Sequence, residues 1–245
     1  MRRAAPSGMG ARRRARGIAL LVVMVVVLLS SLLALWAFRS SLVNEALVGN
    51  DASYQRAFEA AQAMIQDAEQ DIRGTHADGT NCVPSASDVR ICRRGATLRF
   101  IDEDKDLGTL LGRLDTAPTR CLQGICQKRT GEQDFWNDAA AMTEMTADGV
   151  GARYGEYTGA LSAGGSAALA NPLLASRNAS DGGAWYWIEV MPYDRSEAGL
   201  LTDRSKMDLN LNPNVVYRIT AIARGPNQRT QVVLQSTFAH QKLKN

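Results

Sequence analysis

The stretch RRRARGIALLVVMVVVLLSSLLALWAFRSS, residues 12–41, contains 21 consecutive residues without a charge, from Ile18 to Phe38. At a rise of about 1.5 Å per residue, a helix of this length crosses a hydrocarbon layer of about 30 Å. Residues 1–17 carry six arginines and no acidic residue. Because basic residues before a span favour the cytoplasmic side, the sequence predicts one transmembrane helix with the body of the chain outside.

The basic character of the chain is confined to this N-terminal tail. The formal net charge is +3, yet the residues after the tail hold 22 basic against 25 acidic side chains. Because phosphate binding needs a basic face, we expect no nucleic acid among the partners of the body.

The helical pattern continues beyond the apolar run. Apolar residues recur at spacings of three and four residues, which predicts one apolar stripe on a helix; they are Tyr54, Phe58, Ala61, Ile65, Ala68 and Ile72. Asp71, Glu59 and Asp67 lie on the other faces of the helix. We expect Glu59 and Asp67 to be solvated. Arg73 followed by Gly74 is typical of a helix C-terminus. Residues 18–73 are therefore expected to form one helix, and the pair Gly49-Asn50 leaves open the alternative of a bend or interruption there.

Three segments near the C-terminus have the composition of strands. Residues 214–225 and 230–240 alternate apolar and polar side chains across the turn sequence GPNQR, and residues 184–193 are rich in aromatic and β-branched side chains. This pattern predicts an antiparallel hairpin with a third strand. A long helix followed by strands, without alternation, predicts an α+β architecture in which the sheet buries the apolar stripe of residues 54–72.

The resulting division of the chain has five parts. They are a basic leader (1–17), a transmembrane helix (18–38), an amphipathic helix (39–73), a loop-rich variable region (74–180) and a C-terminal antiparallel sheet (181–245). Within the variable region, we expect a short strand at 96–101 and a short helix at 133–145.

All four cysteines lie in the variable region, at Cys82, Cys92, Cys121 and Cys126. An even number of cysteines outside the cytoplasm favours disulfides. Pairing Cys82 with Cys92 and Cys121 with Cys126 would close two local loops, although the sequence alone allows three connectivities. A zinc site is the alternative, but zinc-binding cysteines are typically more closely spaced.

The sequence contains no pattern that indicates catalysis or cofactor binding. Residues 102–108 resemble the start of a calcium loop, but Leu107 stands where that loop needs Gly and Arg113 where it needs Glu. The two histidines, His76 and His240, stand beside no recognisable nucleophile. We therefore expect no catalytic residue, no metal and no cofactor.

Residues 16–69 resemble the N-terminal region of type IV pilins, in particular the PilX-type minor pilins of type IV pilus assembly. The likeness lies in Arg16-Gly17 before the apolar run, RSSL at 39–42, GN at 49–50 and the helical segment AFEAAQA at 57–63. Residues 217–239 resemble the C-terminal end of the same family.

This resemblance implies a defined processing step. A membrane-embedded prepilin peptidase would cut between Gly17 and Ile18, and Ile18 would be N-methylated. Pilins usually carry Glu at the fifth mature position, associated with pairing to a neighbour's N-terminal amine during assembly, whereas this chain has Val22 there. A charge in an apolar bundle is costly unless it is paired. We therefore expect a subunit that need not dock beneath another, at or near the fibre tip.

The expected function is a minor pilin that helps to initiate assembly of the type IV pilus and is not an enzyme. It would be a single-pass inner-membrane protein with a cytoplasmic N-terminus and a periplasmic body, and incorporation into the surface pilus is compatible with this role. Expected partners are other minor and major pilins, prepilin peptidase, inner-membrane lipid and the pilus assembly platform. The alternatives are a minor pseudopilin of a type II secretion system, a membrane-anchored periplasmic binding or sensory domain, and a secreted enzyme released after Ala37.

Overall fold

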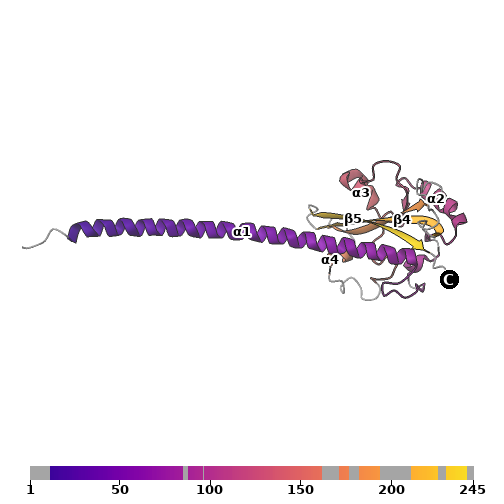
Figure 1. Cartoon of the computed structure of the whole chain (residues 1–245), viewed down its shortest axis with the longest axis horizontal. Helices are drawn as coiled ribbons and strands as arrows, with labels where there is room; N and C mark the ends of the chain where they lie inside the picture. The colour runs from indigo at the N-terminus through magenta and orange to yellow at the C-terminus, as the bar shows by residue number, and fades with distance from the viewer. Residues whose placement is uncertain are drawn as a thin grey trace, which may run out of the picture. The chain divides into compact units, whose positions relative to one another are not determined.

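The computed structural model describes seven segments of the chain (Figure 1), which are residues 12–84, 88–95, 97–161, 171–176, 182–193, 211–225 and 230–241. Residues 1–11 of the expected leader, and parts of the variable region such as 162–170, lie outside them. The chain divides into two units, Met1–Ala52 and Ser53–Asn245.

Helix α1 extends from Arg12 to Arg73. It continues without interruption through Gly49 and Asn50; a single Gly costs a helix only about 1 kcal/mol. Gly74 has φ +65°, and the Thr75 N–H donates to the Gln70 carbonyl at 3.0 Å. This left-handed residue ends the helix where the sequence predicts.

The second unit is built on a five-stranded sheet in the order β1-β2-β3-β4-β5. Its strands are β1 (Cys121–Leu122), β2 (Ile125–Gln127), β3 (Gly183–Pro192), β4 (Leu211–Arg224) and β5 (Gln231–Gln241). The β4–β5 hairpin and the β3–β4 pair are antiparallel, as predicted, and β2 pairs with β3 in parallel. The α+β architecture, with a long apolar N-terminal helix and a mostly antiparallel sheet, is confirmed.

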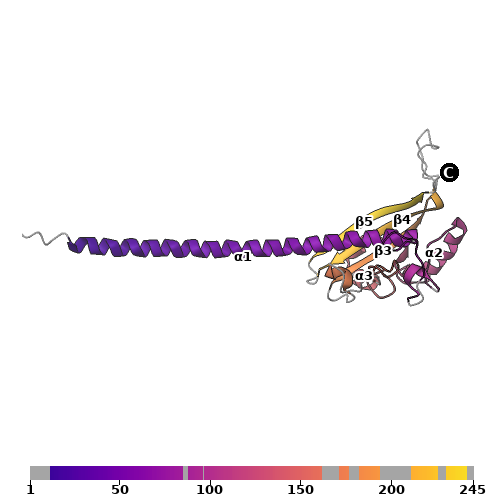
Figure 2. The same ribbon diagram turned by 90° about the horizontal axis from the view of Figure 1, so that it is seen from below.

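The sheet has a hydrophobic layer on each face. On one face, the C-terminal part of α1 packs its buried alanines and Met64 against β-strand residues such as Tyr186 and Ile219. On the other face, Trp185 and Trp187 pack with residues of η3 (Phe135–Asn137) and α3 (Ala139–Met145). Figure 2 shows the ribbon turned by 90°, with α3 and β3 in the second unit. The short helices η1 (Ile91–Arg93), η2 (Asp104–Asp106), α2 (Leu107–Asp115) and α4 (Pro172–Ala175) complete the described elements.

The buried face of α1 is rotated relative to the predicted stripe. Its fully buried apolar side chains are small or flexible, which lets the helix lie close to the sheet; they are Ala57, Ala60, Ala61, Met64 and Ala68. Tyr54 is half exposed, and Phe58 and Ile65 lie at the margin. The rotation brings Asp67 and Asp71 into the interior, with 2% and 7% of their surfaces exposed. The prediction that Asp67 is solvated is therefore wrong, whereas Glu59 is exposed as predicted.

The structure also differs from two smaller predictions in the variable region. Residues 97–101 form no strand; the Leu98 N–H donates to Gln123 Oε1 instead of to a strand neighbour. The helix predicted at 133–145 is split at Asp138, whose carboxylate accepts from the N–H groups of Ala140 and Ala141 and caps α3. Ala96 lies outside the described residues.

Candidate functional site

The first unit presents a helix whose apolar side chains are all accessible. From Ile18 to Phe38 every residue is exposed, and α1 is long and apolar enough to cross a membrane. Ser30 and Ser31 donate their hydroxyl protons to the carbonyls of Val26 and Val27 at 2.7 and 2.8 Å. Because these hydroxyls are satisfied within the helix, this surface can face lipid or another apolar helix.

The predicted processing residues lie in this helix. Gly17 and Ile18 are adjacent in α1, and Val22 follows one turn later with an exposed side chain. Cleavage between Gly17 and Ile18, N-methylation of Ile18 and the effect of Val22 on assembly stay predictions.

Both local pairs of cysteines are disulfides. Cys82 bonds to Cys92, with Cα atoms 5.6 Å apart, and Cys121 bonds to Cys126, with Cα atoms 4.1 Å apart. The first disulfide joins the segment after α1 to η1, and the second closes the β1–β2 hairpin. His76 Nδ1 lies 3.8 Å from Cys82 Sγ, but a sulfur held in a disulfide is not a thiolate ligand for zinc.

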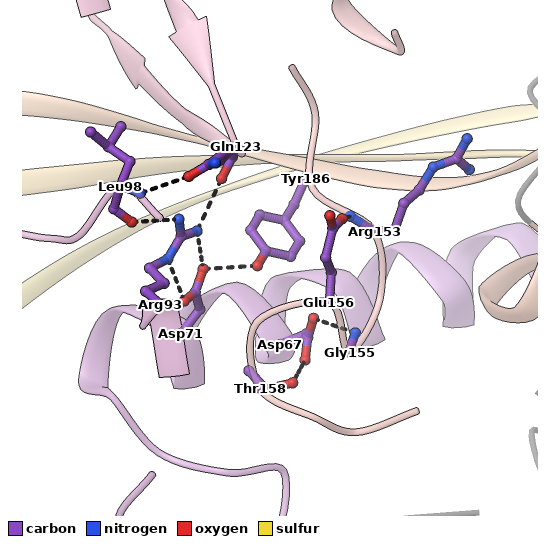
Figure 3. Close-up of polar contacts among 10 residues, drawn as sticks. All are labelled: Asp67, Asp71, Arg93, Leu98, Gln123, Arg153, Gly155, Glu156, Thr158 and Tyr186. Carbon is purple, nitrogen blue, oxygen red and sulfur yellow. Dashed lines mark hydrogen bonds and ion pairs between the residues drawn. The ribbon is translucent and has the colours of Figure 1, made fainter. Parts of the chain in front are cut away.

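A buried ion pair joins α1 to η1 (Figure 3). The Arg93 guanidinium donates from Nε and Nη2 to the two carboxylate oxygens of Asp71, at 2.7 and 2.5 Å. Two further N–H groups donate to the carbonyls of Leu98 and Gln123, and the guanidinium stacks over the Tyr157 ring at 3.8 Å. Burial disfavours the charge of Arg93, but Asp71 outweighs that effect and raises the pKa of Arg93 above its ordinary value.

The same carboxylate also binds the sheet. The Tyr186 hydroxyl, from β3, donates to Asp71 Oδ2 at 2.9 Å. Burial, followed by the nearby carboxylates, raises the pKa of Tyr186 well above its ordinary value, so the phenol stays protonated and remains a donor. Asp71 thus ties α1 both to η1 and to the centre of the sheet, with charge-assisted hydrogen bonds on both of its oxygens.

Asp67 holds a different segment. Its carboxylate accepts from the Gly155 N–H at 2.8 Å and bonds to the Thr158 hydroxyl, so it fixes the loop of residues 153–158 against α1. Burial raises the pKa of Asp67 from 3.8 to about 7, against the lowering effect of these two hydrogen bonds, and the charge of Asp71 raises it further. Asp67 is therefore partly protonated near neutral pH.

A histidine fastens the segment after α1 to the same loop. His76 Nδ1 lies 3.0 Å from the Thr158 carbonyl, and the Val83 N–H donates to His76 Nε2 at 3.0 Å. Both ring nitrogens of His76 therefore take part in hydrogen bonds with backbone groups. Thr158 therefore meets α1 through its hydroxyl and His76 through its carbonyl.

Two parts of the chain match models of one protein family. Residues 16–66 match the PilX N-terminal model, and residues 122–240 match the model described as type IV pilus assembly protein PilX C-term. The chain belongs to the PilX family of type IV pilus assembly proteins. No curated protein and no solved structure matches the chain. The PilX family is structural rather than catalytic.

The two PilX matches cover different parts of the site. The N-terminal match includes Gly17, Ile18 and Val22, and the C-terminal match includes Tyr186 and the loop of residues 153–158. Asp67, Asp71 and Arg93 lie between the two matched ranges. In this PilX-family chain, the buried polar contacts therefore join the two matched regions through a segment that neither model covers.

Proposed function

We propose that this PilX-family chain is a minor pilin of the type IV pilus, anchored in the inner membrane, that helps to initiate pilus assembly at or near the fibre tip. The observation that carries the proposal is the uncharged, exposed helix surface from Ile18 to Phe38, with Val22 at the fifth position of the expected mature chain.

The helix surface suits two successive environments. In the membrane, its apolar side chains contact lipid, at a length that spans the hydrocarbon layer. In a fibre, small residues such as Ala19, Ala34 and Ala37 allow neighbouring helices to approach closely. Because both environments are apolar, moving from one to the other requires no charged side chain of residues 18–38 to be desolvated when position 22 is Val.

The proposed topology places the arginine-rich tail in the cytoplasm and Ser53–Asn245 in the periplasm. Two disulfides in the second unit suit an oxidising compartment. Prepilin peptidase would act on the Gly17-Ile18 bond, and the proposed further partners are inner-membrane lipid, the assembly platform and other minor and major pilins.

A non-catalytic role fits the use of the titratable groups in the described residues. Asp71 is bound by Arg93 and Tyr186, and both ring nitrogens of His76 are hydrogen-bonded to backbone groups. In these contacts, the groups hold the elements of the fold together.

N-terminal mass spectrometry of the protein from membranes and from sheared surface fibres tests the proposal. An N-methylated Ile18 in both fractions supports processing and entry into the pilus. A chain that starts at Met1 indicates a permanently anchored periplasmic domain, and one that starts at Phe38 indicates a secreted protein; either result overturns the pilin function. Co-purification with type II secretion components instead of pilus components would favour the pseudopilin alternative.

A further inference from the structure

The two edges of the sheet are protected very differently. At one edge, β1 has only two residues and is closed by the Cys121–Cys126 disulfide. At the other edge, β5 has eleven residues, from Gln231 to Gln241, and within the described residues its sheet neighbour is β4 alone. A long edge strand presents a row of backbone N–H and C=O groups that can pair with another strand.

The sequence of β5 lacks the usual features that prevent such pairing. QVVLQSTFAHQ contains no Lys, Arg, Asp, Glu or Pro. Its register with β4 is continuous over nine consecutive residue pairs, from Arg224↔Gln231 to Val216↔Ala239, so no bulge interrupts β5 over this length. Charges, prolines and bulges are the means by which edge strands avoid association. An uncharged, regular edge is therefore suited to accept a strand without charge.

The direction of β5 limits which strand can bind. Arg73, the last residue of α1, lies over the Phe238 ring near the end of β5, at 4.8 Å. In both ribbon views β5 runs toward that end of α1. A twofold antiparallel β5–β5 contact between two copies would therefore reverse residues 53–73 of one copy relative to the other. That reversal does not suit two subunits anchored in one membrane.

Other contacts between two copies are also unfavourable. The pairing pattern makes β1 run opposite to β5, but β1 offers only two residues to an antiparallel partner. A parallel β5–β5 pair would place the two α1 helices on opposite faces of the joined sheet, away from a common helix bundle. A strand from a different subunit with the same orientation fits this edge better than a second copy does.

We propose that β5 is the docking edge for an antiparallel, uncharged edge strand of a different pilin subunit, which extends the sheet of this chain. The partner strand needs about five or more residues to form a stable ladder. Backbone hydrogen bonds would supply the affinity, and the side chains on alternate positions would supply selectivity. This inference rests on the proposed pilin function, because the membrane orientation and helix bundle that pilin subunits share are what disfavour pairing of β5 with the β5 of a second copy.

Photo-crosslinking in the full-length, membrane-bound protein tests this edge directly. A photoreactive residue replaces Thr237, which is exposed on β5, and in a control it replaces Thr109, which is exposed on α2. We expect an adduct at position 237 with an edge strand of another pilin subunit, identified by mass spectrometry, and none with that subunit at position 109.

A matched pair of charge variants supplies the second readout. Thr237→Glu places a carboxylate opposite Arg218 in the β4–β5 register, and Thr109→Glu places one four residues before Arg113 on α2, so each new charge has an arginine nearby in its own unit. We expect Thr237→Glu to lower recovery of the partner subunit at least about tenfold, and Thr109→Glu to leave it unchanged. Fluorescence of the buried Trp185 and Trp187 checks that both variants fold.

The outcomes separate the two proposals. An adduct at position 237 with a second copy, an adduct with a protein that is not a pilin, or normal partner recovery with Thr237→Glu overturns the docking edge. A chain correctly processed at Ile18 that forms no adduct at position 237 overturns the docking edge alone. A wild-type chain that retains Met1 overturns the pilin function itself.

Discussion

Asp67 and Asp71 lie one helical turn apart on the buried face of α1, and their carboxylates have hydrogen-bond donors of different charge. Asp71 is paired with the Arg93 guanidinium, whereas Asp67 is bound by the uncharged donors of Gly155 and Thr158. One cation therefore serves two interior carboxylates, and protonation of Asp67 removes the excess negative charge.

The first prediction is that Asp67 makes the free energy of unfolding fall as pH rises between about 4 and 7. The pKa of Asp67 is raised from 3.8 to about 7 in the folded protein, so the folded chain binds a proton over this range that the unfolded chain has lost. Stability falls wherever the folded state binds more protons, by up to about 1.4 kcal/mol per pH unit. The stabilisation from protonated Asp67 is fully present below the unfolded pKa of 3.8, and it is lost as pH rises through the folded pKa of about 7.

Asp67→Asn isolates this effect because the amide oxygen keeps an acceptor for the Gly155 N–H. We expect the variant to lose roughly 2–3 kcal/mol of the decline between pH 5 and 7, measured by urea unfolding of the full chain in detergent with tryptophan fluorescence. Glu59→Gln, on the exposed face of the same helix, serves as the control. Parallel pH profiles for wild type and Asp67→Asn would contradict the assignment.

The second prediction concerns the buried ion pair. Asp71→Asn leaves Arg93 charged and almost fully buried, and breaking one side of a buried pair costs about 3–5 kcal/mol. The exposed pair of Glu69 and Arg73, at 3.1 Å on the same helix, supplies the control, since Glu69→Gln is expected to cost less than about 1 kcal/mol.

A double variant separates the pair from simple loss of packing. Combining Asp71→Asn with Arg93→Met removes the uncompensated charge, so the combined loss of unfolding free energy should be smaller than the sum of the two single losses. Additive losses in urea unfolding would show that Asp71 and Arg93 stabilise the fold independently of each other.

The third prediction concerns the turn between β1 and β2. Gln123 and Gly124 both have positive φ, 54° and 79°, as a two-residue hairpin turn of the primed type requires. A Cβ on Gly124 would lie 2.5 Å from the Cβ of Ala152. We expect Gly124→Ala to lower the thermal midpoint clearly, with a cost of about 2 kcal/mol or more from backbone strain and overpacking. Gly131→Ala, which meets no atom within 4 Å, should be close to neutral.

The elements that the sequence predicted are those whose pattern is local. The apolar run from Ile18, the helix end at Arg73 and the β4–β5 hairpin each follow from composition and periodicity over a short window. By contrast, β1 and β2 have two and three residues and exist because β2 pairs with β3, about sixty residues later. No local periodicity can reveal strands of that length.

The interior position of Asp67 and Asp71 could not be predicted because their partners are distant in sequence. Arg93 follows Asp71 by 22 residues, and Tyr186 by 115. An apolar stripe predicts that the polar side chains of the same helix face solvent, unless a buried partner is known. Burial of a polar side chain is tolerated only where hydrogen bonds compensate its loss of hydration. One signal for their burial was available in the sequence. The two acids are four residues apart, and each directly precedes a residue of the predicted stripe, Ala68 or Ile72.

The last prediction concerns Val22 and rests on the proposed function. If this subunit has no other pilin above whose N-terminal amine it must neutralise, Val22→Glu should leave the number of surface pili unchanged or raise recovery of the subunit in sheared fibres. Val22→Gln is the control of nearly equal size, because it introduces polarity without charge. A Glu variant that is processed at Ile18 but abolishes pili, alongside a Gln variant with normal pili, would argue against a subunit that need not dock beneath another. The loss would show that assembly requires an uncharged residue at position 22, because an unpaired charge among apolar helices is costly.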